Sequence, residues 1–182
     1  MAHVLVVGDG PGGLSAALFL AKKGMQVTVF GKDKTDMHRA MLHNYLGIPE
    51  IRGSEFQQIA RQQVRSFGAS LQDLGVTGIE KTSEGFMVTS EDGGQHQGAY
   101  LILAEGKRLE LAKSLDLPRT ANGVEVDDKG RTAVEGLYVV GRGRGIARSQ
   151  AIISAGQGAT AALDILSREA GRDVKDYDSV SD

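Results

Sequence analysis

The stretch HVLVVGDGPGGLSAALFLAKKGMQVTVF, residues 3–30, decides the fold. Its first five residues form an apolar run typical of a buried strand, and the turn GDGPGG then interrupts it. From Leu14 onward, apolar residues recur at helical spacing until Gly24, which suits a helix C-terminus. Residues 25–30 form a second, β-branched run. Strand, turn, helix and strand in this order predict a βαβ unit whose two strands are parallel.

The turn carries the dinucleotide-binding pattern G-x-G-x-x-G at Gly8, Gly10 and Gly13, with Pro11 and Gly12 inside it. The first glycine permits the tight turn, the second lets a pyrophosphate approach the backbone, and the third lets the helix pack closely on the strand. Free N–H groups and the positive end of the helix dipole then face the phosphates. A glycine-rich turn without a ligand is the alternative, but the flanking strand and helix favour binding. The pattern alone does not separate NAD(P) from FAD.

A second helix is predicted over residues 54–68. Ser54 offers an N-cap, and Gln57 is placed to complete a capping box. Gly68 ends this helix. The apolar residues at helical spacing, which we expect to form its buried face, are Phe56, Ile59, Ala60 and Phe67.

The remainder extends the βαβ unit into one domain. Several short strands over residues 70–103, with a hairpin signal at 92–94, predict a small antiparallel β-meander followed by a buried strand at 100–103. Another buried strand at 137–140 precedes a final helix that begins near Ser149. The predicted fold class is α/β: a single FAD/NAD(P)-binding Rossmann-like domain over residues 1–170, with a central parallel sheet. Residues 171–182 predict a mobile acidic tail.

Composition excludes several classes of function. The 182 residues are 41% hydrophobic and 24% charged, as in globular proteins, and the net charge of −2 gives no reason to expect nucleic acid as a partner. Neither a signal peptide nor a long apolar run is evident, so we expect no membrane partner and a cytoplasmic location. The four histidines have no metal-ligand spacing, and with no cysteine we expect neither a metal site nor an internal dithiol relay.

The end of the second strand lacks a feature that dinucleotide-binding domains normally have. An acidic residue there usually holds the adenosine ribose, but this position is Gly31. Lys32 and Asp33 follow, and Asp33 is a candidate substitute if the loop is shifted. The alternative is that both are solvated loop charges, and the sequence leaves the two equal.

Segments spread over residues 3–168 resemble the thioredoxin reductase family, and this resemblance favours FAD. Residues 4–17 look like the first FAD motif of that family, and residues 135–142 look like the second. Residues 149–156, SQAIISAG, resemble the start of the family's last helix, and residues 44–47 and 100–106 resemble two further segments.

The resemblance assigns particular residues to the cofactor. It places Asn44 beside the flavin, and Gln150 and Ala151 around the flavin pyrimidine. It places the backbone of Gly75 and Val76 at the adenine. The other residues implied are those at the ends of two strands, Ala104, Glu105, Gly106, Gly141 and Arg142.

Several departures from the family limit what this chain can do. Only residues 107–135 separate the two parts of the FAD domain, where the family has a whole nicotinamide-binding domain with a redox-active cysteine pair. Without cysteine, we expect no thioredoxin reductase activity, as in the small single-domain flavoproteins related to that family. Glu105 replaces a threonine and Arg142 replaces an aspartate. Arg142 either pairs with the pyrophosphate or an incoming anion, or belongs with Arg144 to a solvated basic loop.

These features predict a FAD-dependent oxidoreductase that passes hydride or electrons from an external donor, NAD(P)H or a partner protein, to an unknown acceptor. The alternative is a non-catalytic FAD-binding subunit or redox-sensing module, and a weaker one is a plain NAD(P)-binding domain. No catalytic residue is assigned, and His43 is either near the flavin or an ordinary surface residue. A domain without its usual neighbour should expose an apolar face, which favours a homodimer.

Overall fold

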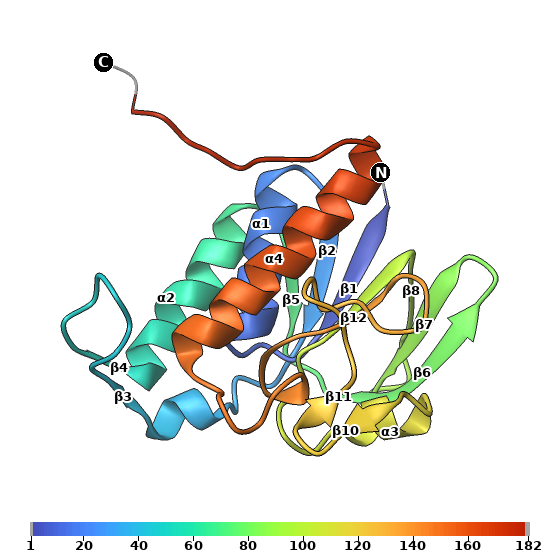
Figure 1. Cartoon of the computed structure of the whole chain (residues 1–182), viewed down its shortest axis with the longest axis horizontal. Coiled ribbons are helices and arrows are strands. Elements are labelled where there is room, and N and C mark those ends of the chain that lie inside the picture. Colours follow the sequence, from blue (N-terminus) through green and yellow to red (C-terminus); the bar gives the residue numbers. More distant parts are fainter. Residues whose placement is uncertain (1, 181–182) are drawn as a thin grey trace.

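A five-stranded parallel sheet forms the centre of the computed structural model, which describes residues 2–180 (Figure 1). The strands lie in the order β12-β9-β1-β2-β5, and every neighbouring pair is parallel. Their bounds are β1 (His3–Val7), β2 (Gln26–Phe30), β5 (Ser70–Gln72), β9 (Tyr100–Leu103) and β12 (Leu137–Val139). The predicted α/β fold with a central parallel sheet is confirmed.

The apolar sequence of β1 reflects its place in the middle of the sheet. Val6 lies opposite Val29 of β2 and opposite Ile102 of β9. Because alternate side chains point to opposite faces, Val4 and Val6 enter one core cluster, whereas Leu5 enters the other. A strand buried on both faces needs apolar residues at every position, and a continuous run results.

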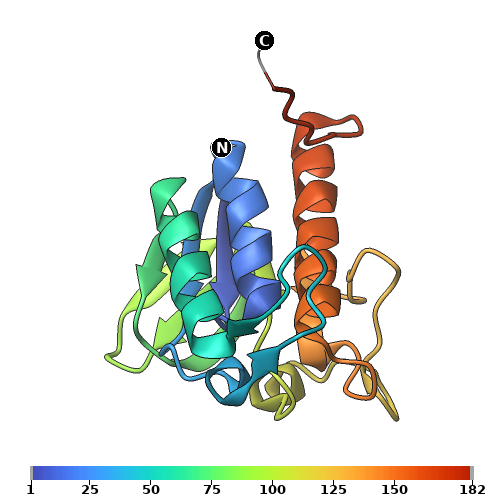
Figure 2. The same cartoon turned by 90° about the vertical axis from the view of Figure 1, so that its left-hand side faces the viewer.

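Helices cover one face of the sheet, and a smaller antiparallel sheet covers the other; Figure 2 shows the helical layer from a second side. The helices are α1 (Pro11–Lys22), α2 (Gly53–Ser66) and α4 (Ala151–Ala170). The second sheet is the meander β6 (Val76–Thr82), β7 (Gly85–Ser90) and β8 (Gln95–Gly98). Phe86 and Val88 of β7 are fully buried against the central sheet. The predicted meander is therefore also confirmed.

Short elements gather at the carboxyl edge of the parallel strands, at the bottom of Figure 1. They are η1 (Asp36–Arg39), β3 (Met41–Leu42), β4 (Ile51–Arg52), α3 (Glu110–Ser114), β10 (Arg119–Thr120), β11 (Gly123–Val124) and η2 (Gly141–Gly143). The stretch after Gly106, for which no element was predicted, holds α3 and the β10–β11 hairpin. Leu109, Leu117 and Val124 anchor this stretch in the core on the meander side of the sheet.

Helices α1 and α4 pack so closely that glycine is required where they meet. A Cβ added to Gly158 of α4 would overlap the carbonyl oxygen of Gly12 and lie 3.0 Å from the Ala16 nitrogen in α1. A Cβ added to Gly12 would lie 3.2 Å from the carbonyl oxygen of Ser154. The glycine turn and the start of α4 are therefore fixed relative to each other by backbone contact.

The sequence prediction for α2 is wrong in its cap and in its buried face. The helix begins at Gly53 after an Arg52 cap, and Ser54 is exposed rather than the N-cap. Ile59 and Phe67 are exposed, at 51% and 43% of their surface. The side chains that point inward include the polar Gln57 and Arg61, because their hydrogen-bonding partners lie beneath the helix.

The segment after Gly171 follows the C-terminal ends of α4 and α1. The amide of Val174 donates to the hydroxyl of Ser167, and Asp176 pairs with Lys22 and Lys23 at 3.0 and 2.8 Å. Its mobility in solution stays a prediction, and residues 181–182 lie outside the described part. Every helix within residues 2–180 is too short or too polar to span a bilayer.

The contact at Gly158 predicts opposite effects for two alanine substitutions in α4. Gly158→Ala should lower the free energy of unfolding by about 1–3 kcal/mol, because the new methyl group forces α4 away from α1. Gly156→Ala should raise it by about 0.5–1 kcal/mol, since no described atom outside its own stretch of helix lies within 4 Å of its Cβ position and alanine favours the helix. Urea denaturation followed by circular dichroism measures both. A Gly158→Ala protein as stable as Gly156→Ala would contradict the close contact.

Candidate functional site

The candidate site lies at the carboxyl edge of the parallel sheet, where the loops after four strands converge. In open parallel sheets, ligands bind in the crevice outside this edge. The loops are residues 8–13 after β1, 31–35 after β2, 104–106 after β9 and 140–143 after β12. They contain most of the residues that the sequence predicts to contact a cofactor.

The glycine turn after β1 has the geometry that its pattern predicts. Gly8 has φ of +108°, and a Cβ there would overlap the carbonyl oxygen of Ala104. A Cβ at Gly13 would overlap the carbonyl oxygen of Gly8, so the third glycine allows α1 to pack on the turn. For a Cβ added at Gly10, the nearest atom apart from its neighbours in the chain is the Cγ2 of Thr35, 4.0 Å away. Two glycines thus close the turn, while the second faces a gap that a ligand backbone could enter.

Two helix N-termini meet at this edge. A Cβ at Gly12 would lie 3.2 Å from the Ser154 carbonyl oxygen in α4 and 3.5 Å from the Gly141 nitrogen. Within the described residues, neither α1 nor α4 has an acidic side chain in its first turn or a side-chain cap. Their free N–H groups and positive dipole ends remain uncompensated by the protein. This arrangement fits an anionic group such as a pyrophosphate.

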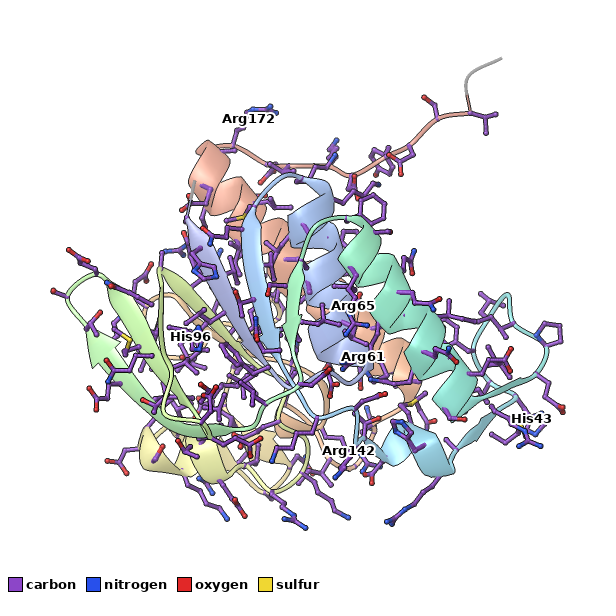
Figure 3. The ribbon with its side chains drawn as sticks, turned by 180° about the vertical axis from the view of Figure 1, so that it is seen from behind. His43, Arg61, Arg65, His96, Arg142 and Arg172 are labelled. Atoms are coloured by element: carbon purple, nitrogen blue, oxygen red, sulfur yellow. The ribbon has the colours of Figure 1, made fainter. Side chains whose placement is uncertain are left out.

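A buried ionic network supports the turn from below. Arg61, which is 5% exposed, donates to the carboxylate of Asp9 and also to that of Asp73. One turn earlier on α2, Gln57 donates its side-chain amide to the Asp9 carbonyl oxygen. Figure 3 shows Arg61 reaching from α2 toward the sheet. Helix α2 thus holds both the side chain and the backbone of the residue between Gly8 and Gly10.

The Asp9 carboxyl group occupies the space next to Gly31. A Cβ at Gly31 would overlap that carboxyl group, which explains why position 31 has no side chain. Asp9 is 4% exposed and accepts from the Asp33 amide at 3.0 Å. Burial raises the pKa of Asp9, while the Asp33 amide and the Arg61 charge act in the opposite direction. Nothing in the sequence indicates that Asp9, the residue between the first two glycines of the turn, is buried.

The predicted adenine end lies beside the loop after β2. A Cβ at Gly75 would lie 3.0 Å from the Cε of Lys32 and 3.3 Å from a carboxylate oxygen of Glu91. Lys32 and Glu91 form an ion pair, and the Glu91 amide donates to the Gly75 carbonyl oxygen at 2.9 Å. Gly75 therefore lies close to Lys32, as a shared adenine region requires. Sequence reasoning missed Glu91.

The predicted flavin end is joined by contacts between distant segments. The Asn44 amide donates to the Gln150 side-chain oxygen at 3.1 Å. Arg142 forms an ion pair with Asp36 and donates to the Ser149 hydroxyl at 2.9 Å. In Figure 3, Arg142 lies next to the segment after β2, whereas His43 lies out on the 43–50 loop. Asn44 and Gln150, and likewise Asp36 and Arg142, thus meet although the members of each pair are 106 residues apart in sequence.

Three other residues that the sequence suggests as candidates, Glu105, Gly106 and His43, have structural roles or partners of their own. The Glu105 carboxylate accepts from the amides of Leu111 and Ala112 at 3.0 and 2.8 Å, so its charge is directed to the start of α3. Gly106 has φ of +83° and permits the turn that follows. His43 is largely exposed and lies 3.4 Å from Glu50.

Sequence reasoning also missed residues that support the site. Gln157 accepts from the Gly141 amide at 2.8 Å and so fixes the turn after β12 to α4. Gln57 and Arg61 are spaced four apart on α2, a spacing that puts two polar side chains on one helix face. The spacing shows that the two residues share a face of α2, but it does not show that this face is buried.

Comparison with known proteins places the chain in a family. Residues 2–109 match the family described as pyridine nucleotide-disulphide oxidoreductase. The chain belongs to this family. It is 31% identical over 107 residues to thioredoxin reductase from Aquifex aeolicus (strain VF5), covering 57% of this chain and 33% of the relative. It is 32% identical over 108 residues to a subunit of alkyl hydroperoxide reductase from Staphylococcus aureus (strain NCTC 8325 / PS 47), covering 57% of this chain and 21% of that relative.

Solved structures support the same fold. The atypical thioredoxin reductase TRi from Desulfovibrio vulgaris Hildenborough matches with a TM-score of 0.84 at 18% identity, over 94% of this chain and 99% of that one. A thioredoxin reductase from Gloeobacter violaceus matches with a TM-score of 0.81 at 18% identity, over 99% of each chain. At such low identity these matches bear on the fold alone. The family member described here spans a third or less of the length of the two curated relatives.

The buried network predicts a large cost for removing its cation. Arg61→Met should lower the free energy of unfolding by about 3–5 kcal/mol, because it leaves the Asp9 charge buried without a partner. Arg65→Met, one turn further along α2 at an exposed position, should change it by less than about 0.5 kcal/mol. Adding Asp9→Asn to Arg61→Met should recover part of the loss. Equal effects of the two arginine substitutions in urea denaturation would rule out the network.

Proposed function

We propose that this chain is an FAD-binding flavoprotein oxidoreductase that takes hydride or electrons from an external donor and works without a dithiol. The observation that carries the proposal is the meeting of two uncapped helix N-termini, of α1 and α4, beside the gap at Gly10. A dinucleotide with a central pyrophosphate places its negative charge where these dipoles point. FAD, when bound, supplies the two-electron chemistry.

Each part of the site suits one part of the cofactor. The turn at Gly8–Gly13 lies against the pyrophosphate, with Arg142 as a neighbouring cation. The backbone of Gly75 and Val76, beside Lys32, lies at the adenine. The start of α4 at Gln150 and Ala151, with Asn44 beside it, faces the pyrimidine side of the flavin.

The flavin end of the site also offers apolar contacts. The first turn of α4 exposes Ile152 and Ile153, at 37% and 41% of their surface, although both are large aliphatic residues. Leu46, two residues after Asn44, is 89% exposed. All three residues lie within three positions of Asn44 or Gln150, which are hydrogen-bonded to each other. A planar aromatic ring bound there would cover them.

The donor comes from outside this chain in the proposed function. Residues 107–135 contain α3, β10–β11 and a turn at Asp127–Gly130, and they pack against the rest of the same domain. Within residues 2–180 they therefore form no second nucleotide-binding unit. The donor proposed is NAD(P)H or a partner protein, and the acceptor is unassigned. Relatives named for thioredoxin reductase and alkyl hydroperoxide reductase make a redox role the natural choice.

The central prediction is that the purified protein is yellow, or becomes yellow after reconstitution with FAD. Addition of NADH or NADPH without oxygen should then bleach the visible absorption band of the flavin, on the order of seconds for a working reductase. The visible spectrum measures both steps. Yellow protein that neither nucleotide nor a partner protein reduces would support a non-catalytic subunit instead. Protein that cannot be reconstituted with FAD would rule out the flavoprotein proposal.

Arg142 allows a test of the pyrophosphate position. Arg142→Ala should weaken FAD binding by about 10-fold, because a charged hydrogen bond to a phosphate is lost. Arg144→Ala should leave the affinity unchanged, since Arg144 donates instead to the Asp128 carbonyl oxygen at 3.1 Å. Isothermal titration of the apoprotein with FAD measures both affinities. An unchanged affinity in Arg142→Ala would remove Arg142 from the site and leave its Asp36 pair as its role.

A further inference from the structure

The surface beside the predicted flavin end carries an excess of positive charge. Residues 107–120 and 141–149 together contain seven lysines and arginines and two acidic residues, although the whole chain has a net charge of −2. Within residues 2–180, the five exposed cations of these segments form no ion pair. These five residues, here called the cationic face, are Lys107, Arg108, Lys113, Arg119 and Arg148.

The two segments that carry the cationic face are joined through their backbones. The amide of Ile146 donates to the Asn122 carbonyl oxygen at 2.8 Å, and a Cβ added to Gly123 would overlap the carbonyl oxygen of Gly143. Figure 1 places α3 and β10, which hold part of the face, at the carboxyl edge of the sheet. Arg148 lies two residues before Gln150, the cap of α4. The face therefore lies at the same edge as the proposed flavin site.

Few acidic side chains oppose this charge. Glu110 and Asp116 are the two acids on the segments themselves. The Glu105 carboxylate, just before them, accepts from the first amides of α3. Residues 125–128 hold three more acids after β11, of which Asp127 accepts from two amides of its own turn. The cationic face thus remains positive and attracts anionic partners.

The distribution of the charge favours a protein as the partner. Nucleic acid strands are usually held by aromatic rings placed among the cations, but neither segment contains an aromatic residue. A free dinucleotide presents its phosphates to one turn, whereas these five cations come from two segments that are distant in sequence. Exposed charges spread in this way are typical of the rim of a protein interface, where they guide association.

We propose that the external electron donor is an acidic redox protein that docks on the cationic face. Attraction between the opposite charges brings the donor to the edge of the sheet at which the flavin is proposed to lie. Each encounter oxidises a one-electron carrier. Two encounters, with one proton taken from water, convert FAD to its reduced anion. This inference rests on the proposed binding of FAD and chooses the partner protein over NAD(P)H as the donor.

Two charge-reversal variants separate the face from the charge of the whole molecule. The first variant combines Arg108→Glu with Arg119→Glu on the face. The second combines Arg172→Glu with Lys175→Glu and makes the same change in net charge after α4; Figure 3 shows Arg172 and Arg142 at opposite ends of the molecule. All four substituted positions are exposed, so both variants should unfold at nearly the same urea concentration as the wild type.

The probe is a plant-type [2Fe–2S] ferredoxin, a small acidic one-electron carrier. At about 0.01 M ionic strength, isothermal titration should show at least about 10-fold weaker binding to the face variant and unchanged binding to the second variant. Wild-type binding should weaken by about 10-fold at about 0.1 M ionic strength, because salt screens exposed charges. In anaerobic stopped flow, reduced ferredoxin freed of its reductant should bleach the wild-type flavin about 10-fold faster than that of the face variant. Reduced methyl viologen, a small cation, should reduce the face variant no more slowly than the wild type.

Several outcomes would overturn the inference. Equal weakening in both variants would show that only the net charge matters. Tighter binding of a single-stranded oligonucleotide than of ferredoxin, at about 0.1 M ionic strength, would assign the face to nucleic acid instead. Rapid reduction by NADPH without ferredoxin binding would exclude the docking role and leave the proposed function intact. If the protein binds no FAD, the proposed function fails, whereas titration of the apoprotein with ferredoxin still tests the face.

Discussion

The ion pair between Asp9 and Arg61 is the interaction on which the arrangement of the site depends. Both side chains are almost entirely buried, and burying charges is costly unless they are paired and hydrogen-bonded. Here the pair fixes the residue between the first two glycines of the turn, and Asp33 is fixed to the same carboxylate. Arg61 extends the network to Asp73, two residues before Gly75 of the predicted adenine segment. One buried arginine thus connects the loop after β1, the loop after β2 and the start of the meander.

Much of the fold could be predicted from the sequence because local patterns and the core agree. The strand–turn–helix–strand order of residues 3–30 fixes the parallel pair β1–β2, and the meander follows from turn signals and alternation. The cap and face of α2 could not be predicted, because Gln57 and Arg61 are buried only through partners that are distant in sequence. The helix α3 and the hairpin β10–β11 within residues 107–124 were not predicted, for a related reason. Their leucines and Val124 become core residues only when the meander is present to receive them.

In the site, too, local features could be predicted from the sequence and contacts between distant residues could not. The glycine positions of the turn could be predicted because their sterics are local, as at Gly8. The meeting of Asn44 with Gln150 depended on family resemblance, since no local pattern brings residues 106 positions apart together. The overlap between the Asp9 carboxyl group and any side chain at position 31 could not be predicted, because the two positions come together only in the folded chain. In the sequence, Gly31 looks like the loss of the usual acidic residue after β2. In the structure, this glycine makes room for the carboxyl group of Asp9.

The ion pairs of the site also differ in how far water reaches their charges. Dissolved ions screen exposed charges strongly and buried ones weakly. Arg142 and Asp36 are open to solvent, with 36% and 62% of their side chains exposed, whereas Asp9 and Arg61 are closed to it. A rise in ionic strength therefore weakens the contact between η1 and η2 while leaving the support beneath the glycine turn intact. The salt-sensitive parts of the site are thus the pair between η1 and η2 and the exposed Lys32–Glu91 pair, whereas the glycine turn keeps its shape.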